Sequence, residues 1–338
     1  MAVSSLAQES STDLAGIKDY LIVHGSQMQT STEAIQADAQ AYFDRIQHVL
    51  AEHPDENPYE HLWDEHSDEL VALLLRAKQS WILAHNDYEL VEGIVAGVPS
   101  LAYYDTWIDA GASCEEAPDE CVEWTLELND GRVYDSPGNL FHNLLETTLW
   151  GTVEAYTAMA ADLDGDGQIE LGEALPEANM FVAASAAMNQ ATTEMNQAIA
   201  GWEPNLEDTF TALLAMLPTM GEYFEEWKLS SFIIGEDPRF VAQTRLVDIK
   251  GIATSLDVIY SYVGVRVAEQ DAALDEQIAT GFDELLDFLD QVYAQEQVGV
   301  AFSPEEADFL GTEAQDMAQS LAALVAQAAA AMALELQP

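Results

Sequence analysis

The segment DLDGDGQIELGE, residues 162–173, carries side chains whose types and spacing suit a hard cation. Acidic residues occupy its first, third and fifth positions, glycine its sixth, isoleucine its eighth and glutamate its twelfth. This is the pattern of an EF-hand calcium loop, in which the glycine allows a sharp turn and the final glutamate binds with both oxygens. The candidate Ca²⁺ ligands are Asp162, Asp164, Asp166, the carbonyl of Gln168, Glu170 and Glu173.

An acidic surface turn that binds no ion is the alternative interpretation of this segment. The match at every diagnostic position favours calcium. A single loop of this kind occurs in the sequence. We therefore expect a calcium ion that stabilises the fold rather than one that switches it.

Two other segments each place a histidine four residues before a glutamate, first His85 and Glu89, then His142 and Glu146. Residues at this spacing share one face of a helix. Helices that each present an imidazole and a carboxylate inward can build a mixed nitrogen and oxygen site for iron, zinc or manganese. With the acidic residues nearby, the candidate transition-metal ligands are His85, Glu89, Glu92, Asp105, Asp109, His142 and Glu146.

The alternative is that these histidines form surface pairs or are satisfied in the core. In a chain with 61 acidic residues, a glutamate often falls four residues from a histidine by chance. The neighbours Trp81, Phe141, Leu145 and Trp150 favour burial, and a buried charge needs a partner or a metal. The spacing alone leaves both interpretations open.

The two cysteines, Cys114 and Cys121, lie in a polar, acidic stretch that is too irregular for a helix. We expect a local disulfide, which favours an oxidising compartment. A metal site built on the two thiolates is less favoured, because no histidine or further cysteine flanks them.

Motifs for covalent or nucleotide chemistry are missing from the sequence. It has no recognisable nucleophile elbow, no phosphate-binding glycine-rich loop and no dinucleotide-binding pattern. Arg245 and Asp248 are expected to form a structural ion pair, and Lys228 to pair with a nearby glutamate. We therefore predict no catalytic residues.

Apolar residues recur at three- and four-residue spacing along most of the chain, which predicts an all-α protein of antiparallel helical bundles. A single hairpin with a turn at Asp130 and Gly131 is expected within residues 123–134. The predicted helices cover residues 12–28, 31–52, 68–96, 101–110, 138–160, 174–200, 206–216, 219–230, 238–266, 268–297 and 304–335.

Three segments are expected along the chain. Residues 1–150 form an N-terminal helical half with the cysteine loop and the hairpin. Residues 151–180 hold the EF-hand segment, and residues 181–338 form a C-terminal bundle.

Charge limits the partners. The 338 residues carry a formal net charge of −51, which repels nucleic acid and anionic lipid, and no long apolar stretch predicts membrane insertion. Screening ions or bound divalent cations would relieve the self-repulsion. The first residues lack the basic and apolar regions of a signal peptide, so the protein is either cytoplasmic or had such a peptide removed. The expected disulfide favours removal and a periplasmic or secreted location.

Parts of the chain resemble a known family. The segments HNDYELVEGIVAGVPSLAYYDTWIDAGAS, EYFEEWKLSSFIIGE and FVAQTRLVDIKGIATSLDVIY look like the low-iron-inducible periplasmic proteins, the algal iron-assimilation proteins. The likeness spans about residues 80–112 and 220–262. More distantly, FHNLLETTLWG is similar to imelysin-type proteins, which include periplasmic iron-uptake components. The imelysin motif has two residues between its histidine and glutamate, whereas three separate His142 from Glu146 here.

The resemblance implies an extracytoplasmic helical protein that binds iron, Fe²⁺ or Fe³⁺, and passes it to an uptake system at the cell surface without enzymatic turnover. A calcium-dependent structural or adhesion protein without a transition metal is one alternative. An imelysin-type peptidase is the other.

Overall fold

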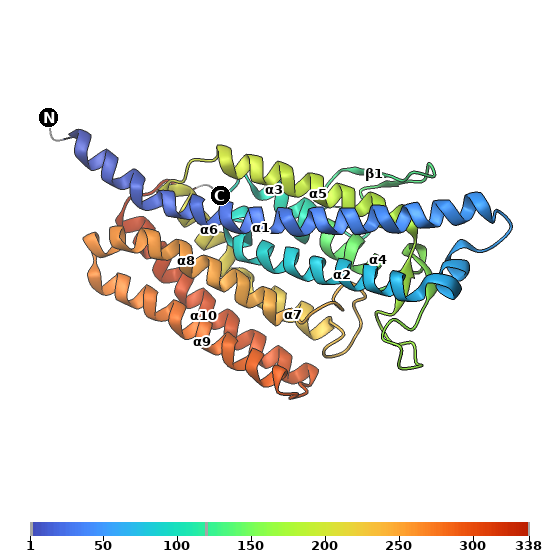
Figure 1. Ribbon diagram of the computed structural model, residues 1–338. Helices are drawn as coiled ribbons and strands as arrows, with labels where there is room; N and C mark the ends of the chain where they lie inside the picture. Colours follow the sequence, from blue (N-terminus) through green and yellow to red (C-terminus); the bar gives the residue numbers. More distant parts are fainter. Residues whose placement is uncertain (1–2, 119–120, 337–338) are drawn as a thin grey trace.

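Long helices packed side by side make up most of the structure, a computed structural model that describes residues 3–118 and 121–336. Figure 1 shows α1 and α5 along one side, α2 and α8 in the middle, and α9 and α10 on the opposite side. The prediction of an all-α helical bundle is confirmed. These long helices are α1 (Val3–Glu52), α2 (Pro58–Val95), α5 (Ala178–Gly201), α8 (Leu246–Gln270), α9 (Ala272–Gln297) and α10 (Pro304–Ala331).

Shorter elements fill the connections between the long helices. Two of them, η1 and η2, are π-helices, in which the backbone bonds skip one extra residue. The shorter helices are α3 (Ala102–Asp105), η1 (Thr106–Ala110), η2 (Leu140–Glu146), α4 (Thr147–Leu149), η3 (Glu154–Tyr156), α6 (Leu206–Met216), η4 (Leu217–Thr219) and α7 (Met220–Leu229). None of the described helices is long and apolar enough to cross a membrane.

Polar side chains fix where several helices begin. The side chain of Asn57 accepts a hydrogen bond from the Tyr59 amide, with Pro58 in the first turn of α2. Before α10, Ser303 and Glu306 bond to each other's backbone amides in a capping box. The predicted start of this helix at residue 304 is therefore confirmed.

The predicted break in the first helix, between residues 28 and 31, is wrong, because α1 runs through it without interruption. The polar residues there face α5 instead of ending the helix. Gln29 donates a 2.5 Å hydrogen bond to the Asn189 amide oxygen, and Asn196 donates to the Gly25 carbonyl. These polar side chains interrupt the apolar spacing of α1, so the sequence suggests a loop where the helix in fact packs against α5.

The predicted helix over residues 138–160 is also wrong in its second half. The helical segment ends at Leu149, and Gly151 follows with a positive φ of 65°. The chain then forms β3 (Thr157–Ala160), which pairs antiparallel with β4 (Ala174–Pro176). The acidic loop therefore joins two strands, whereas an EF-hand loop joins two helices.

The predicted hairpin and disulfide are both confirmed. Strands β1 (Thr125–Glu127) and β2 (Val133–Asp135) pair antiparallel around the turn at Gly131. Cys114 and Cys121 are joined by a disulfide. In the C-terminal half, α8 begins at Leu246 instead of residue 238, after an irregular stretch that contains Pro238.

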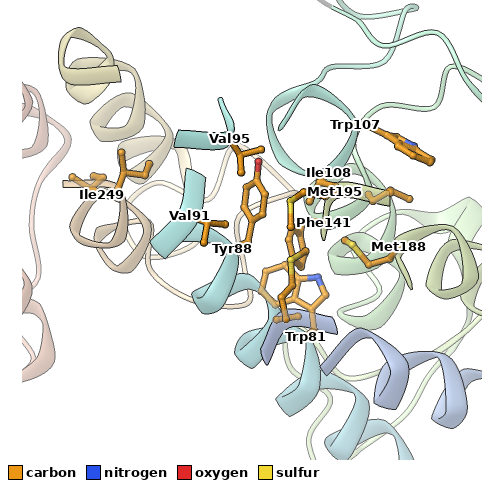
Figure 2. Packing of buried hydrophobic residues seen from close by; sticks show 14 of the residues in the cluster. Trp81, Tyr88, Val91, Val95, Trp107, Ile108, Phe141, Met188, Met195 and Ile249 are labelled. Carbon is orange, nitrogen blue, oxygen red and sulfur yellow. The ribbon is translucent and has the colours of Figure 1, made fainter. Parts of the chain in front are cut away.

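Buried aromatic residues surround the middle of α2. Figure 2 shows Phe141 from η2 lying between Tyr88 and Trp81 of α2, with Met188 and Met195 of α5 close by. The rings of Trp81 and Phe141 meet edge to face at 5.6 Å. All five side chains are buried, which gives the polar groups beside them a rigid wall of low polarity.

Candidate metal centre

Four separate elements bring buried histidines and carboxylates together at the centre of the bundle. Helix α2 supplies His85 and Glu89, and the π-helix η1 supplies Asp109. The second π-helix, η2, supplies His142, and the first turn of α8 supplies Asp248. All five side chains are almost fully buried. π-Helical turns are often found at functional sites, and here both of them carry residues of the same cluster.

The nitrogen and oxygen atoms of this cluster point toward one another. The Nε2 atoms of His85 and His142 are 3.1 Å apart. Asp109 Oδ1 is 3.4 Å from the first nitrogen and 3.2 Å from the second, and Glu89 Oε1 is 3.2 Å from His85 Nε2. We call His85, Glu89, Asp109 and His142 the central four.

These separations match the distances between neighbouring ligands of a bound transition metal. With metal–ligand bonds of about 2.0–2.2 Å, adjacent ligand atoms lie roughly 2.8–3.6 Å apart in octahedral or tetrahedral geometry. Neither oxygen of Glu89 has a hydrogen-bond partner among the described residues, and neither does Oδ1 of Asp109. These oxygens approach imidazole nitrogens without accepting a hydrogen bond from the described chain, and buried carboxylate oxygens without hydrogen bonds are costly unless a cation binds them. The ligand atoms of His85, Asp109 and His142 lie within 4.8 Å of one another and Glu89 adjoins His85, so this group of side chains fits a metal ion.

Glu146 orients His142 and is not aimed at the central atoms. Its Oε2 is 2.6 Å from Nδ1 of His142, on the far side of the ring from Nε2. Its Oε1 accepts hydrogen bonds of 2.7 Å from the amides of Val241 and Ala242. A carboxylate behind a histidine in this way fixes the ring and strengthens its other nitrogen as a metal ligand.

His85 has an equivalent support on its own far side. Its Nδ1 lies 3.4 Å from Asp248 Oδ1 and 2.9 Å from the side-chain nitrogen of Gln243. The ring stacks on Trp81 with centroids 4.7 Å apart and planes 10° from parallel. Both imidazoles are therefore held in place with Nε2 directed at the centre.

Two of the predicted ligands belong to an outer layer. Asp105 accepts a 2.7 Å hydrogen bond from the Tyr88 hydroxyl, and Glu92 accepts one of 2.5 Å from the Tyr223 hydroxyl. One oxygen of Glu92 still lacks a partner among the described residues. The structure thus brings all seven predicted residues into one buried region, with four at the centre and three around them.

Several buried acidic and histidine side chains of this region have strongly shifted pKa values. Burial raises the pKa of Glu89 and Glu92 well above the usual range, and neighbouring carboxylates add to the effect. Burial opposes charge on His142 as well, but Asp109 and Glu146 together outweigh it and raise the pKa of His142 to about 10. Burial opposes ionisation of Asp109, yet the two imidazoles hold the pKa of that carboxyl well below its usual range. Bound protons thus supply positive charge that a metal cation could replace.

Arg245 is the main cation that sequence reasoning placed only in a structural role. Its expected pair with Asp248 is present at 2.7 Å, and it also binds Glu226 at 2.7 Å. In addition, its Nη1 lies 3.0 Å from Nε2 of His142. The three-residue spacing of Arg245 and Asp248 was visible in the sequence, but their position beside His142 depends on the tertiary fold.

A pocket of about 260 Å³ connects this region with the surface. Its lining includes Asp109, His142 and Arg245 together with Tyr223, Arg239 and Phe240. Arg239 is held by a 2.6 Å ion pair with Asp237. The pocket gives an ion a route to two of the central four.

The acidic loop is a separate feature between β3 and β4. Asp162 accepts hydrogen bonds from the amides of Gly165 and Gly167, and Glu173 folds back to accept bonds from the amides of Leu163 and Glu170. Oxygens of Asp162, Asp164 and Glu173 lie within 4.8 Å of one another. The loop therefore has a turn that gathers its acidic side chains, while its calcium ligands stay a prediction.

Comparison with known proteins assigns the chain to a family. A search of the curated proteins found no match. A model of the peptidase M75 family, described as imelysin, matches residues 16–330, nearly the whole length. The match includes every member of the buried cluster, and the likeness to low-iron-inducible proteins stays a prediction. The chain belongs to the imelysin family.

Proposed function

We propose that the protein binds iron outside the cytoplasm as part of iron uptake, with the ion held by the central four residues. The observation that carries the proposal is the approach of His142 Nε2, Asp109 Oδ1 and Glu89 Oε1 to within 3.1–3.4 Å of His85 Nε2, although neither carboxylate oxygen accepts a hydrogen bond from the described residues. Family membership supports it, as does the disulfide, which favours an oxidising compartment.

The chemistry suits capture and release of a borderline or hard cation. Imidazole and carboxylate ligands together accept Fe²⁺ and Fe³⁺, and they also accept zinc and manganese. The charge of −51 attracts cations toward the molecule, and the pocket beside Asp109 leads them to the ligands. Carboxyl and imidazole groups exchange their protons for the ion, so acid favours release.

The test is metal analysis of the purified protein after loading with Fe²⁺ without oxygen, or with Fe³⁺ citrate. Wild type is expected to hold one iron that is lost in Asp109→Asn and in His142→Ala. Asp105→Asn is the matched control, because Asp105 lies one turn earlier and binds Tyr88 instead of facing the histidines. Calcium as the sole metal under every loading condition, or iron binding by Asp109→Asn equal to wild type, contradicts the proposal.

A peptidase is the second candidate, since the family is named for that activity. Neither buried oxygen of Glu89 accepts a hydrogen bond from the described residues, and burial raises its pKa, which suits a general base. Hydrolysis of a peptide library by metal-loaded wild type, lost in Glu89→Ala but not in Asp105→Asn, supports this function. No hydrolysis by the loaded protein counts against it.

We also propose that the acidic loop binds one structural calcium ion. The clustering of Asp162, Asp164 and Glu173 oxygens supports this, together with the loop pattern in the sequence. Chelation of calcium is expected to lower the melting temperature of wild type, because an ion that binds only the folded chain stabilises it. Asp162→Asn should lower it in calcium and make it insensitive to chelation. An unchanged melting temperature after complete calcium removal contradicts a stabilising role.

A further inference from the structure

A second group of histidines surrounds the turn between α1 and α2. Four of the seven histidines in the chain lie within residues 48–66, and three more residues of this stretch are glutamates that approach them. Histidine is the commonest metal ligand among the side chains, so its concentration at one turn is chemically informative. The four histidines are His48, His53, His61 and His66.

Three side chains of this turn meet closely. Nδ1 of His61 lies 2.8 Å from Oε2 of Glu56, and Nδ1 of His53 lies 3.4 Å from the other oxygen of the same carboxylate. The two imidazole rings face each other with centroids 4.4 Å apart and planes 31° from parallel. The ligand atoms of His53, Glu56 and His61 all lie within 4.8 Å of one another. The imidazole of His53, just after α1, and that of His61 on α2 thus approach one carboxylate.

The backbone explains how residues from two helices reach the same place. The amide of His53 bonds to the Val49 carbonyl at the end of α1, and Asn57 caps the start of α2. His61 follows one turn into α2, and the helix then kinks at His66, whose φ and ψ are −139° and 27°. The turn and the kinked first part of α2 bring His61 back toward the end of α1.

The surroundings favour a small cation. A cavity of about 410 Å³ adjoins the turn, and its lining includes both His53 and His61. Its one cationic side chain among the lining residues, Arg45, pairs with Glu69 at 3.2 Å. The acidic residues that line this cavity are Asp44, Glu52, Glu65 and Glu69.

We propose that His53, Glu56 and His61 form a second metal site, at the surface, for a borderline divalent transition ion such as Zn²⁺. Two imidazoles and one carboxylate match a three-ligand zinc site with an open fourth position. Nitrogen donors distinguish this site from the all-oxygen acidic loop, which suits calcium. The side chain of His61 is 15% exposed and that of His53 is 40% exposed, so an ion can exchange with solvent.

This surface site is independent of the central four. His61 and His85 are both on α2 and 24 residues apart, which corresponds to a distance on the order of 30 Å along a kinked helix. Loss of metal at either place should leave the other unaffected, so the two proposals can fail separately.

Equilibrium dialysis against ZnCl₂, with excess calcium present to occupy oxygen-only sites, tests the proposal. The double variant His53→Ala/His61→Ala is expected to bind one zinc fewer per chain than wild type, and Glu56→Gln should lose the same ion. His142→Ala should keep it. The matched control is His48→Ala, because His48 is 70% exposed and pairs with Glu52 outside the proposed ligand set.

Two further readouts make the outcome decisive. Zinc should raise the melting temperature of His142→Ala but not that of the same protein with the two surface histidines removed. Circular dichroism shows whether each variant is folded, and Glu56→Gln replaces an exposed side chain without changing its size. Zinc binding by the double variant equal to wild type, or loss of the ion in His48→Ala, overturns the proposal.

Discussion

Glu146 illustrates how one residue can support a site without touching the ion. Sequence spacing places it on the same helical face as His142, and for that reason it was predicted as a ligand. In the structure its two oxygens are used by His142 and by two backbone amides. Its position four residues after His142 lies inside a π-helix, whose wider turn still brings the carboxylate against Nδ1.

Glu146→Gln is therefore expected to weaken metal binding without unfolding the protein. The amides of Val241 and Ala242 would hold the glutamine oxygen, so its NH₂ group would face Nδ1 of His142 and move the ring proton to Nε2, the nitrogen needed by the metal. Loss of such an orienting partner typically costs about 10–100-fold in affinity. Iron titration measures this, and Glu154→Gln, an exposed position, serves as the control. Equal affinities would show that Glu146 does not set the tautomer.

At the scale of elements, α2 and α8 approach closely where the site is built. A Cβ atom added at Gly251 of α8 would lie 2.6 Å from Cβ of Glu89, and one added at Gly93 of α2 would lie 2.4 Å from Oγ of Ser255. Glycine on each helix thus allows the contact. Because Glu89 lies directly at this crossing, the helix spacing determines where its carboxylate reaches.

Gly251→Ala should consequently both destabilise the fold and weaken metal binding at the central four. Overpacking of this kind costs about 1–3 kcal/mol in the free energy of unfolding, and displacement of Glu89 should reduce iron affinity. Gly201→Ala is the matched control, since nothing lies within 4 Å of its added Cβ. Denaturant unfolding and iron titration of both variants check the prediction. A Gly251→Ala protein as stable as Gly201→Ala would contradict it.

Lys78 connects α2 to the acidic loop and gives a pH-dependent contact. It donates a 2.5 Å hydrogen bond to the Gly172 carbonyl and lies 5.1 Å from the ring centre of Trp150. Burial lowers the pKa of Lys78 from its ordinary value of 10.5 to about 8. Between those two pH values the unfolded chain keeps the proton while the folded chain releases it, so stability rises with pH.

We expect wild type to gain on the order of 3 kcal/mol relative to Lys78→Met as the pH rises from 8 toward 10.5, since each pKa unit corresponds to about 1.4 kcal/mol. Below pH 8 the difference between the two proteins should be constant, because Lys78 is then charged in both states. Urea unfolding at several pH values, in constant calcium, measures the difference. Parallel curves for the two proteins would show that Lys78 titrates normally.

Regular features of the fold could be predicted from the sequence, and irregular ones could not. Helix α6 begins and ends where periodicity places it, because Asn205 provides its cap. The pairing of β3 with β4 was missed, because each strand is only a few residues long and depends on its partner. The π-helical turns that position Asp109 and His142 have no sequence pattern of their own. The seven candidate ligands were identified from residue type, while their division into central and outer groups required the tertiary structure.

For the whole molecule, the net charge of −51 is the dominant property. None of the six long helices carries a basic residue in its last turn within the described part of the chain, so their negative ends are not offset locally. Repulsion among the surface carboxylates opposes the compact state at low ionic strength. Bound cations and screening salt therefore contribute to the stability of this fold.

The melting temperature should rise when NaCl is increased from about 10 mM to about 300 mM, at constant excess calcium. Over this range the screening length falls from roughly 30 Å to below 10 Å, which removes repulsion between distant carboxylates. The gain should then level off, because interactions between adjacent charges are screened less. Sodium and potassium chloride should act alike, since screening depends on ionic strength and not on ion identity. A melting temperature that does not change with salt, or that responds only to calcium, would show that specific cation sites rather than general screening offset the charge.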